Sequence, residues 1–366
     1  RFPMRFLHFP ILELAVVVSL SGAPVLHGET FLRSLDAFDT LALPGGGGAK
    51  TPAEWESRRE MILEGVRTIM GKLPGEEKRV PLEVRVEEET DCGTYVRRLI
   101  SYASEPGSRT PAYLCIPKSS LSGKPAPGVL CLHPTENTLG YKVVVGLGGK
   151  QNRQYASELA ERGFVTISPS YPLLANYQPD LKALRWESGT LKAVWDNMRA
   201  LDLLDSLPYA RHGKYAAIGH SLGGHNSVYT ALFDPRIQVV VSSCGLDSYR
   251  DYYGGDPTKW VLEKGWCQTR YMPKLAKYQN RLAEIPFDFP ELLAALAPRH
   301  VLINAPLKDS NFKWESVDRV AESARRVYAL HGVGDRIVVE HPDCDHDFPD
   351  AVREKAYARM TEVLSK

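Results

Sequence analysis

Residues 126–366 alternate between short apolar runs and longer segments with apolar residues every three or four positions. The runs at 128–132 and 237–242 have the length of buried strands. The segment 190–207 is typical of the helices between such runs, because one of its faces carries only core residues: Leu191, Val194, Met198, Leu201 and Leu204. Strands that alternate with helices predict an α/β fold, with a mostly parallel central sheet flanked by helices.

The remaining elements follow from the same patterns. Alternation of apolar and polar residues predicts an antiparallel lead-in of strands at 81–88, 94–101 and 112–116. Further strands are predicted at 164–168, 300–304 and 336–340, and helices at 51–71, 151–162 and 350–364.

The N-terminal region resembles a secretory signal. Met4 and Arg5 give a basic start, residues 11–20 are mostly apolar, and small residues follow. Cleavage after Ala23 would leave a proline next, so a site near Gly28 is equally compatible. We therefore expect a signal peptide over residues 1–28 and a secreted or periplasmic protein. A Gly-rich linker over 29–50 and a single α/β domain over 51–366 would follow.

The alternation of strands and helices lapses over residues 247–297. This stretch is rich in aromatic residues, namely Tyr249, Tyr252, Tyr253, Trp260, Trp266, Tyr271, Tyr278, Phe287 and Phe289. Such side chains either pack an insertion onto the body of the domain or form the wall of a pocket. We expect a cap-like insertion. Tyr171 and Tyr177, in an earlier loop, are expected near the mouth of the same pocket.

Charge and composition limit the partners. The net charge is +1, 43% of the residues are hydrophobic and 24% are charged. No basic stripe suggests nucleic acid, and the leader is too short for a confident membrane span, so we expect neither nucleic-acid binding nor stable membrane insertion. The six cysteines and the histidines show no metal-ligand spacing, which predicts buried free thiols and no metal or cofactor.

The sequence Gly-His-Ser-Leu-Gly at 219–223 fits a nucleophile elbow. A serine there occupies a sharp turn from a strand into a helix, so only glycine fits two positions before and after it. An apolar strand precedes Ser221, and helical periodicity follows it at Val228, Ala231 and Leu232. Ser221 is therefore the candidate nucleophile.

A serine nucleophile requires a histidine base and an orienting acid. In chains with this elbow, the order is serine, acid, histidine. His346 lies in the loop between the last predicted strand and the last helix, where the base is expected. His341, at the end of that strand, is the alternative.

The acid is expected in the loop after the strand 300–304. Asp309 is the only carboxylate in residues 305–311, so it is the candidate, although it could also be a turn former. Asp247, after the strand 237–242, is the alternative. The carboxylates on either side of His346 are too local to reach around its imidazole, and we expect a solvated acidic loop of Asp343, Asp345 and Asp347.

An oxyanion hole requires two backbone N–H donors. Leu222, directly after the nucleophile, is expected to supply one. The loop after the strand 128–132 is expected to supply the other, and because Pro134 has no N–H, Thr135 is the candidate and Glu136 the alternative. His133 is expected to shape this loop.

The span from Trp55 to Leu364 resembles the α/β-hydrolase superfamily, specifically its acetyl xylan esterase-related and dienelactone hydrolase-like branch, which borders the prolyl oligopeptidase-type hydrolases. The likeness rests on the elbow through His225 and on the segments 132–135, 155–163, 304–309 and 345–349. Dienelactone hydrolases proper carry a cysteine at the elbow, and this chain carries Ser221. The resemblance implies hydrolysis of carboxylic esters and, for an exported member, of acetylated polysaccharide.

These observations predict a serine carboxylic-ester hydrolase that forms an acyl-serine. Its expected substrates are short-acyl (acetyl) esters of small molecules or carbohydrates. A prolyl oligopeptidase-like serine peptidase is the first alternative, although the residues before the first sheet crossover leave no room for a propeller domain. A non-catalytic binding protein is the second.

Overall fold

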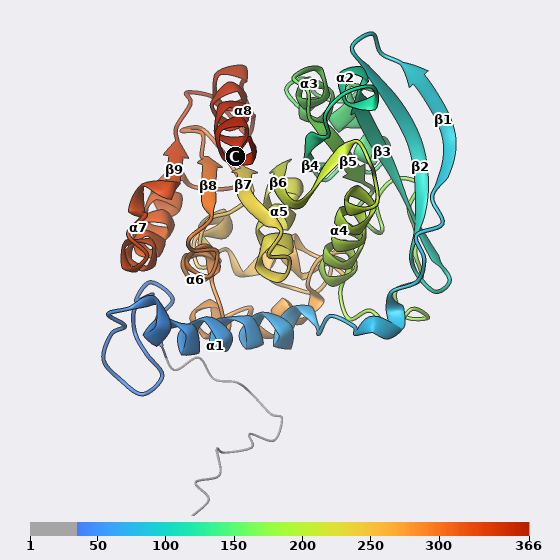
Figure 1. The fold of residues 1–366 in the computed structure, drawn as a ribbon. Coiled ribbons are helices and arrows are strands. Elements are labelled where there is room, and N and C mark those ends of the chain that lie inside the picture. Colours follow the sequence, from blue (N-terminus) through green and yellow to red (C-terminus); the bar gives the residue numbers. More distant parts are fainter. Residues whose placement is uncertain (1–34, 366) are drawn as a thin grey trace, which may run out of the picture. The chain divides into compact units, whose positions relative to one another are not determined.

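The computed structural model describes residues 35–365, so the signal peptide expected over 1–28 lies outside the described residues. The described chain is built around a nine-stranded sheet with strand order β1-β2-β3-β5-β4-β6-β7-β8-β9 (Figure 1). The strands are β1 (Arg85–Asp91), β2 (Tyr95–Glu105), β3 (Ser108–Pro117), β4 (Ala126–Leu132), β5 (Val165–Pro169), β6 (Ala210–His220), β7 (Ile237–Ser243), β8 (His300–Asn304) and β9 (Ile337–Glu340).

The pairing of neighbouring strands changes from antiparallel to parallel at β5. Strands β1, β2, β3 and β5 pair in antiparallel fashion. Every pair from β5 and β4 to β8 and β9 is parallel. The prediction of a mostly parallel sheet is confirmed, and the predicted antiparallel strands form its lead-in edge.

Helices cover both faces of this sheet (Figure 1). They are α1 (Pro52–Met70), α2 (Lys118–Leu121), α3 (Tyr155–Glu161), α4 (Gly189–Asp205), α5 (Leu222–Phe233), α6 (Phe289–Ala294), α7 (Trp314–Leu330) and α8 (Asp350–Leu364). Short 3-10 helices lie at η1 (Glu76–Lys78), η2 (Gly140–Val145) and η8 (Gly334–Arg336).

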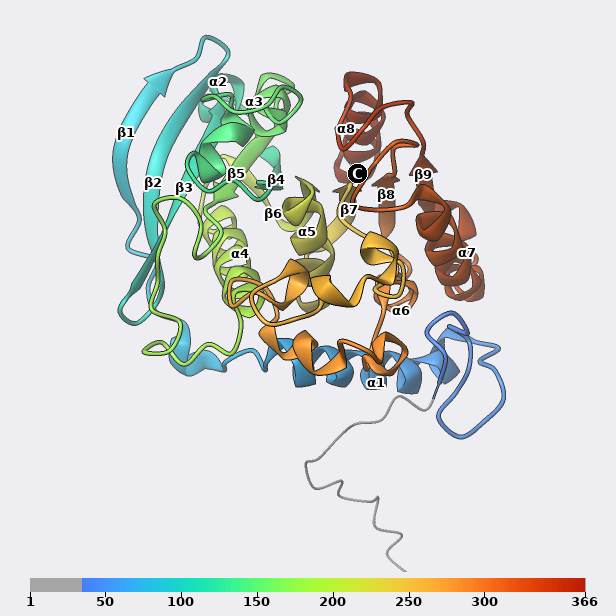
Figure 2. The same ribbon diagram turned by 180° about the vertical axis from the view of Figure 1, so that it is seen from behind.

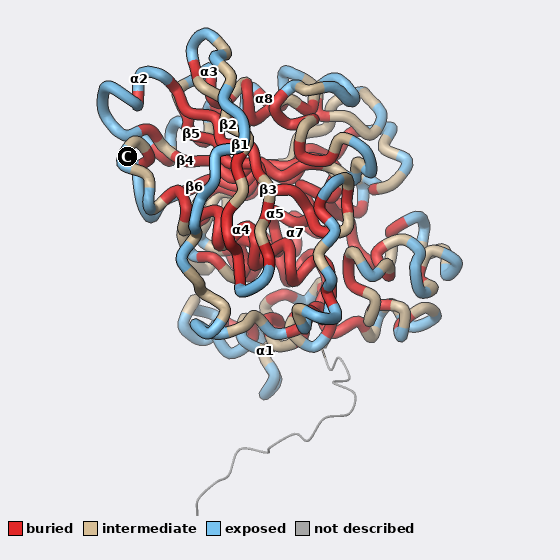
Figure 3. Tube along the Cα trace, turned by 90° about the vertical axis from the view of Figure 1, so that its right-hand side faces the viewer, coloured by how far each residue is buried: buried red, intermediate tan, exposed pale blue. Residues whose placement is uncertain are grey.

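The alternation of side chains along β7 shows how the two layers form. Val239 and Val241 belong to one apolar cluster with Ala356 of α8, while Val240 belongs to another with Val228 of α5. Successive strand residues point to opposite faces, so the middle of a strand covered on both faces is apolar on both sides, as residues 239–241 are here. The tube coloured by burial accordingly shows a continuous buried interior (Figure 3).

The Gly-rich segment before α1 packs against the domain. Ala42 and Gly48 form an isolated antiparallel bridge, which closes the run of glycines into a turn. Thr40 Oγ1 donates to the carbonyl of Ser323 at 2.6 Å, and Trp55 Nε1 donates to the carbonyl of Thr40 at 2.7 Å. The expectation of a flexible linker over 29–50 is therefore wrong for its described part, because long-range hydrogen bonds hold that part to α1 and α7.

The insertion 247–297 has little regular structure. It consists of α6 and the 3-10 helices η3 (Tyr252–Gly255), η4 (Pro257–Lys259), η5 (Gly265–Cys267), η6 (Pro273–Tyr278) and η7 (Leu282–Glu284). Its orange path lies beside α1 and crosses in front of α5 in Figure 2. Tyr249, Trp260 and Phe287 are fully buried, so aromatic packing, rather than backbone periodicity, fixes this segment.

All six cysteines lie in the described part of the chain as free thiols. Cys115, Cys131, Cys244 and Cys267 are buried, and Cys92 and Cys344 are partly buried. Among residues 35–365, no helix combines the length and apolar character needed to cross a bilayer.

Candidate active site

Ser221 occupies the turn between β6 and α5. Its backbone lies at φ 54° and ψ −120°, in the left-handed half of conformational space, and its N–H donates to the carbonyl of Ser243 at 2.7 Å. A Cβ on Gly219 would lie 2.1 Å from the carbonyl carbon of Gly223, and one on Gly223 would lie 2.0 Å from the carbonyl oxygen of Leu132. The strained turn is thus held by close backbone approaches that exclude any other residue at these two positions.

His346 and Asp309 form a hydrogen-bonded pair. His346 Nδ1 lies 2.8 Å from Asp309 Oδ2. The other carboxylate oxygen accepts the backbone N–H groups of Asn311, at 2.8 Å, and Phe312, at 3.3 Å. The Asp309 side chain is only 1% exposed. This arrangement fixes the imidazole through Nδ1 and leaves Nε2 free to face the cavity that His346 shares with Ser221.

The loops that carry this pair are joined by backbone hydrogen bonds. Leu307 N donates to the carbonyl of Pro342, and Lys308 N donates to the carbonyl of Cys344, both at 3.1 Å. These bonds continue the parallel β8–β9 ladder beyond the ends of the strands.

Asp347 anchors the histidine loop. Arg153 Nη1 donates to its Oδ1 at 2.6 Å, and Asn152 Nδ2 donates to its Oδ2 at 2.7 Å. Partial burial raises the pKa of Asp347, but these hydrogen bonds outweigh burial and hold that pKa below its usual value. The expectation of a wholly solvated acidic loop is therefore wrong for Asp347, although Asp343 is exposed and pairs with Lys308 at 2.6 Å.

The alternative base and acid lie in other networks. His341 Nδ1 is 2.8 Å from the carbonyl oxygen of Ala305, and its Nε2 is 3.0 Å from Asp318 Oδ1. Asp247 accepts the backbone N–H of Lys313 at 3.3 Å. Burial raises the pKa of Asp247 well above its usual value, which favours a neutral carboxyl group. A neutral carboxyl group stabilises an imidazolium poorly. Asp309, in contrast, accepts a hydrogen bond from His346 Nδ1, so we favour Asp309 as the acid.

His133 shapes the loop after β4. Its Nε2 accepts the backbone N–H of Tyr171 at 2.9 Å, so the proton lies on Nδ1, which donates to the carbonyl of Pro134 at 2.8 Å. Burial lowers the pKa of His133 to about 4, and the ring is therefore neutral near pH 7. This places the candidate donor Thr135 on the cavity that contains Ser221.

Leu222 is the first residue of α5, and the first N–H groups of a helix have no acceptor within the helix. Thr135 lies in an exposed bend of the loop after β4, and its Oγ1 lies 2.8 Å from the Tyr271 hydroxyl. Glu136 uses its carboxylate to accept the N–H groups of Thr138 and Leu139, at 2.8 Å and 3.2 Å. Thr135 thus lines the same cavity as Ser221, and Leu222 directly follows Ser221 in the chain.

The cavity above Ser221 has a volume of about 460 Å³. The insertion supplies most of its wall, with Tyr252, Tyr253, Lys259, Lys264, Gly265, Trp266, Gln268, Arg270 and Tyr271. Asn311 and Phe312 complete it beside the acid loop. Sequence patterns indicated the aromatic residues of this wall but missed its polar ones, because the irregular path gives no periodicity to read.

The expectation for the loop after β5 is wrong. Tyr171 and Tyr177 are buried, only 5% exposed each, and do not line the cavity. The Tyr171 hydroxyl donates to the carbonyl of Arg270 at 2.8 Å, and the Tyr177 hydroxyl donates to Asp196 Oδ2 at 2.9 Å. Both support neighbouring segments.

Comparison with known proteins finds a protein family that matches part of this chain. A family described as "Glucuronyl esterase, fungi" matches residues 184–332, a span that includes Ser221 and Asp309 and ends before His346. The 4-O-methyl-glucuronoyl methylesterase 1 of Wolfiporia cocos is 27% identical over 192 residues, which are 47% of this chain and 45% of the fungal protein. The chain thus spans less than half the length of that relative.

Solved structures match over nearly the whole chain. A glucuronoyl esterase from Solibacter usitatus superposes with a TM-score of 0.71 at 18% identity, covering 92% of this chain and 99% of that one. The chain therefore has the α/β-hydrolase fold of these esterases. A family 15 carbohydrate esterase from Caldicellulosiruptor kristjansonii gives a TM-score of 0.66 at 18% identity, with 91% of each chain covered. The resemblance of this α/β-hydrolase to carbohydrate esterases is confirmed.

Three possible metal ligands, one of them His346 itself, lie close together at this site. Ligand atoms of His220, Cys244 and His346 lie within 4.8 Å of one another. Burial raises the pKa of the Cys244 thiol well above its usual value. The Cys244 Sγ donates to the carbonyl of Asp347 at 3.3 Å, and the His220 ring packs 4.7 Å from that of His346. We infer that Cys244 and His220 support the position of His346.

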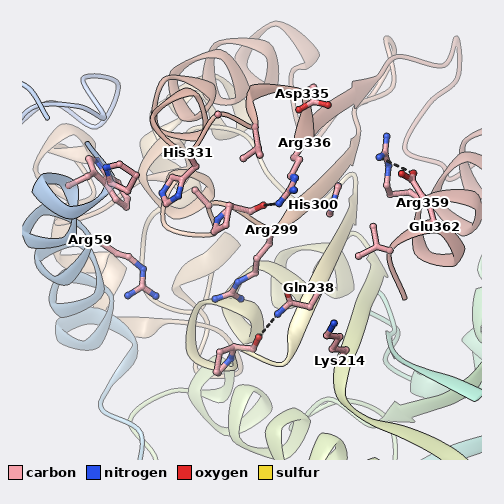
Figure 4. A pocket seen from close by; sticks show the side chains of 18 of the residues that line it. Arg59, Lys214, Gln238, Arg299, His300, His331, Asp335, Arg336, Arg359 and Glu362 are labelled. Atoms are coloured by element: carbon pink, nitrogen blue, oxygen red, sulfur yellow. Dashed lines mark hydrogen bonds and ion pairs between the residues drawn. The ribbon is translucent and has the colours of Figure 1, made fainter. Parts of the chain in front are cut away.

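A larger cavity of about 920 Å³ lies at the opposite end of the strands (Figure 4). It includes His300, where β8 begins, whereas Asp309 and His346 follow the ends of β8 and β9. Its arginines are engaged locally: Arg299 donates to the carbonyl of Ala231, and Arg336 donates to the carbonyl of Pro298 at 2.7 Å. Open α/β sheets react at the carboxyl ends of their strands, so this cavity is not the candidate active site.

Proposed function

We propose that this α/β-hydrolase is a serine carboxylic-ester hydrolase that acts on carbohydrate esters. The observation that carries the proposal is the 2.8 Å hydrogen bond between His346 Nδ1 and Asp309 Oδ2, in a cavity shared with a strained Ser221. The family match and the carbohydrate-esterase neighbours support the substrate class.

The reaction proceeds in two halves. His346 Nε2 takes the proton of Ser221 as Oγ attacks the ester carbonyl carbon, and the N–H groups of Leu222 and Thr135 stabilise the oxyanion. The tetrahedral intermediate collapses, the C–O bond to the alcohol breaks, and His346 returns the proton to the leaving oxygen. Water then attacks the acyl-serine with the same proton transfers, releasing the acid and restoring Ser221. Asp309 accepts the hydrogen bond from His346 Nδ1 and stabilises the imidazolium each time it forms.

The cavity wall suits a polar alcohol such as a sugar, and the likeness to a neighbour described as an acetyl xylan esterase supports a short acyl group. Its wall combines Trp266 and several tyrosines with Lys259, Gln268 and Arg270, a mixture suited to stacking and hydrogen bonding a sugar. We therefore infer acetyl esters of carbohydrate as the substrate. The second candidate is an alkyl ester of a uronic acid, in which the sugar is on the acid side, because the matched family and the fungal relative are described as acting on glucuronoyl esters.

Purified enzyme tests both the activity and the ester type. We expect hydrolysis of 4-nitrophenyl acetate that falls with acyl length towards decanoate, and acetate release from acetylated xylan. Replacing Ser221 by Ala should lower kcat by about 10⁴ or more. Faster hydrolysis of methyl glucuronate than of any acetyl ester would select the second candidate. Undiminished esterase activity in Ser221→Ala would refute the proposal.

Two reagents separate the other classes. A fluorophosphonate should label wild type and not Ser221→Ala, and lack of labelling with a folded protein would favour a binding protein. An Ala-Pro anilide tests the peptidase alternative, and we expect cleavage far slower than that of 4-nitrophenyl acetate.

We also propose that the protein is exported, on the strength of the leader over residues 1–28. Expression of the full chain in a bacterial host, followed by fractionation and measurement of the intact mass, tests this. Recovery of uncleaved protein only in the cytoplasm would contradict it.

A further inference from the structure

We propose that Lys259, Lys264 and Arg270 form a subsite for a negatively charged group on the substrate, a carboxylate of an acidic carbohydrate. All three side chains line the cavity that contains Ser221 and His346. The inference rests on the proposed esterase function and specifies which carbohydrate esters fit.

The charge of this cavity differs from that of the whole chain. Lys and Arg number 45 against 44 Asp and Glu in the sequence, so charges nearly balance overall. Of the described residues that line the cavity, three are cations and none is Asp or Glu. A cleft lined by one sign of charge concentrates field and attracts ligands of the opposite sign.

Neutral groups position two of these cations, Arg270 and Lys259, without cancelling their charge. Arg270 Nε donates to Gln268 Oε1 and Nη1 donates to Asn137 Oδ1, both at 2.8 Å. Its guanidinium lies 5.2 Å from the centre of the Tyr271 ring. The Lys259 Nζ lies 5.0 Å from the centre of the Tyr253 ring. Amide oxygens and aromatic faces orient a cation but leave it able to bind an anion.

The two carboxylates within residues 256–270, Asp256 and Glu263, each accept hydrogen bonds from a threonine. Asp256 accepts the N–H and the hydroxyl of Thr258, at 2.9 Å and 2.8 Å. These hydrogen bonds, with a smaller contribution from Lys259, lower the pKa of Asp256. Glu263 accepts the N–H and the hydroxyl of Thr269, at 3.1 Å and 2.5 Å. Neither carboxylate lines the cavity.

The arrangement suits a carboxylate on a sugar ring beside the scissile ester. A guanidinium presents a planar pair of donors to a carboxylate, whereas an ammonium acts as a mobile point charge. Arg270 is partly buried and Lys264 is exposed. Arg270 should therefore contribute more to affinity than Lys264, because screening by water weakens an exposed ion pair.

Competition against a neutral substrate tests the subsite. Trigalacturonate and galactotriose, which differ mainly in charge, are added to 4-nitrophenyl acetate hydrolysis, and their inhibition constants are compared. We expect trigalacturonate to inhibit at a concentration about tenfold lower at low salt, with the advantage shrinking as NaCl is raised. Binding of both sugars to Ser221→Ala is measured by calorimetry, so the result does not depend on esterase activity.

Variants assign the effect to individual side chains. Arg270→Gln should raise the inhibition constant of trigalacturonate by about tenfold, and Lys264→Gln by about threefold, with little change for galactotriose. Lys264→Arg should retain the preference, which shows that charge and not folding is responsible. Lys277→Gln is the matched control, because Lys277 is an exposed cation of the same insertion that does not line the cavity.

Equal binding of trigalacturonate and galactotriose to Ser221→Ala would overturn the subsite, whether or not the enzyme hydrolyses esters. An equal loss in Lys277→Gln would also overturn it, because the preference would then reflect overall charge. Failure of the esterase function itself would appear separately, as absence of Ser221-dependent ester hydrolysis with sugar binding intact.

Discussion

Arg153 and His346 are joined through the main chain: Nη2 of Arg153 donates to the carbonyl of His346 at 3.3 Å, while its Nη1 binds Asp347 at 2.6 Å. The guanidinium thus holds the loop that presents the imidazole, without touching the reacting atoms. It is a positioning residue.

Replacing Arg153 by Gln should lower kcat by about tenfold and leave KM nearly unchanged, because a misplaced imidazole affects proton transfer more than ground-state binding. Arg153→Lys should recover part of the loss. Steady-state kinetics with 4-nitrophenyl acetate measure both values. Arg162→Gln, which removes an exposed pair with Glu354, is the control, and an equal loss of kcat in that variant would contradict the assignment.

The two candidate acids make a ranked prediction. Asp309→Asn should lower kcat by about 10⁴, because the amide can no longer stabilise the imidazolium or fix its tautomer. Asp247→Asn should change kcat only a few fold, since that buried carboxyl accepts a backbone N–H away from the imidazole. Comparison of kcat in the two folded variants decides the matter, and the reverse order would assign the acid to the loop after β7.

The candidate donor Thr135 can be tested by removing its N–H alone. Thr135→Pro should lower kcat by about 10² to 10³, the usual effect of losing one oxyanion donor. Thr135→Ala keeps the N–H and loses only the contact with the Tyr271 hydroxyl, so its kcat should stay within a few fold of wild type. Similar rates in both variants would shift the donor to Glu136.

Buried histidines predict how stability depends on pH. Burial lowers the pKa of His133 to about 4 and that of His225 to about 3, below the ordinary value of about 6.5. The unfolded chain therefore binds more protons than the folded chain at mildly acid pH. This contribution to the free energy of unfolding is complete above about pH 6.5 and is lost as pH falls towards 4.

Thermal unfolding at several pH values measures this loss. His225→Phe, which keeps a ring against Trp266, should show a smaller fall in Tm between pH 7 and pH 4 than wild type. An unchanged slope would mean that other groups control the acid response.

The sequence predicts those features that local patterns specify. The predicted strand 300–304 has the observed bounds, because the apolar run of residues 301–303 between His300 and Asn304 has the length and composition of a buried parallel strand. Ser221 followed from its glycines, and Asp309 and His346 followed from their order after predicted strands. The antiparallel lead-in followed from its alternation of apolar and polar residues.

Long-range contacts in irregular segments have no such signature. Arg153 and Asp347 are 194 residues apart, and nothing in either neighbourhood indicates that they meet. A run of four glycines is typical of a flexible linker, and no local pattern in the sequence predicts the bridge between Ala42 and Gly48. The cations of the insertion reach the cavity through successive 3-10 helices, whose path depends on buried aromatic packing.

The backbone hydrogen bonds that join the loops of Asp309 and His346 imply that both side chains lose their positions when these bonds break. If the amides of Leu307 and Lys308 release the carbonyls of Pro342 and Cys344, both candidate side chains, Asp309 and His346, lose their support in one local opening. Hydrogen exchange at these two amides should then proceed at the rate at which the enzyme transiently inactivates. A substitution that weakens the pairing of the edge strand β9 would displace Asp309 and His346 together and leave Ser221 and its turn unchanged.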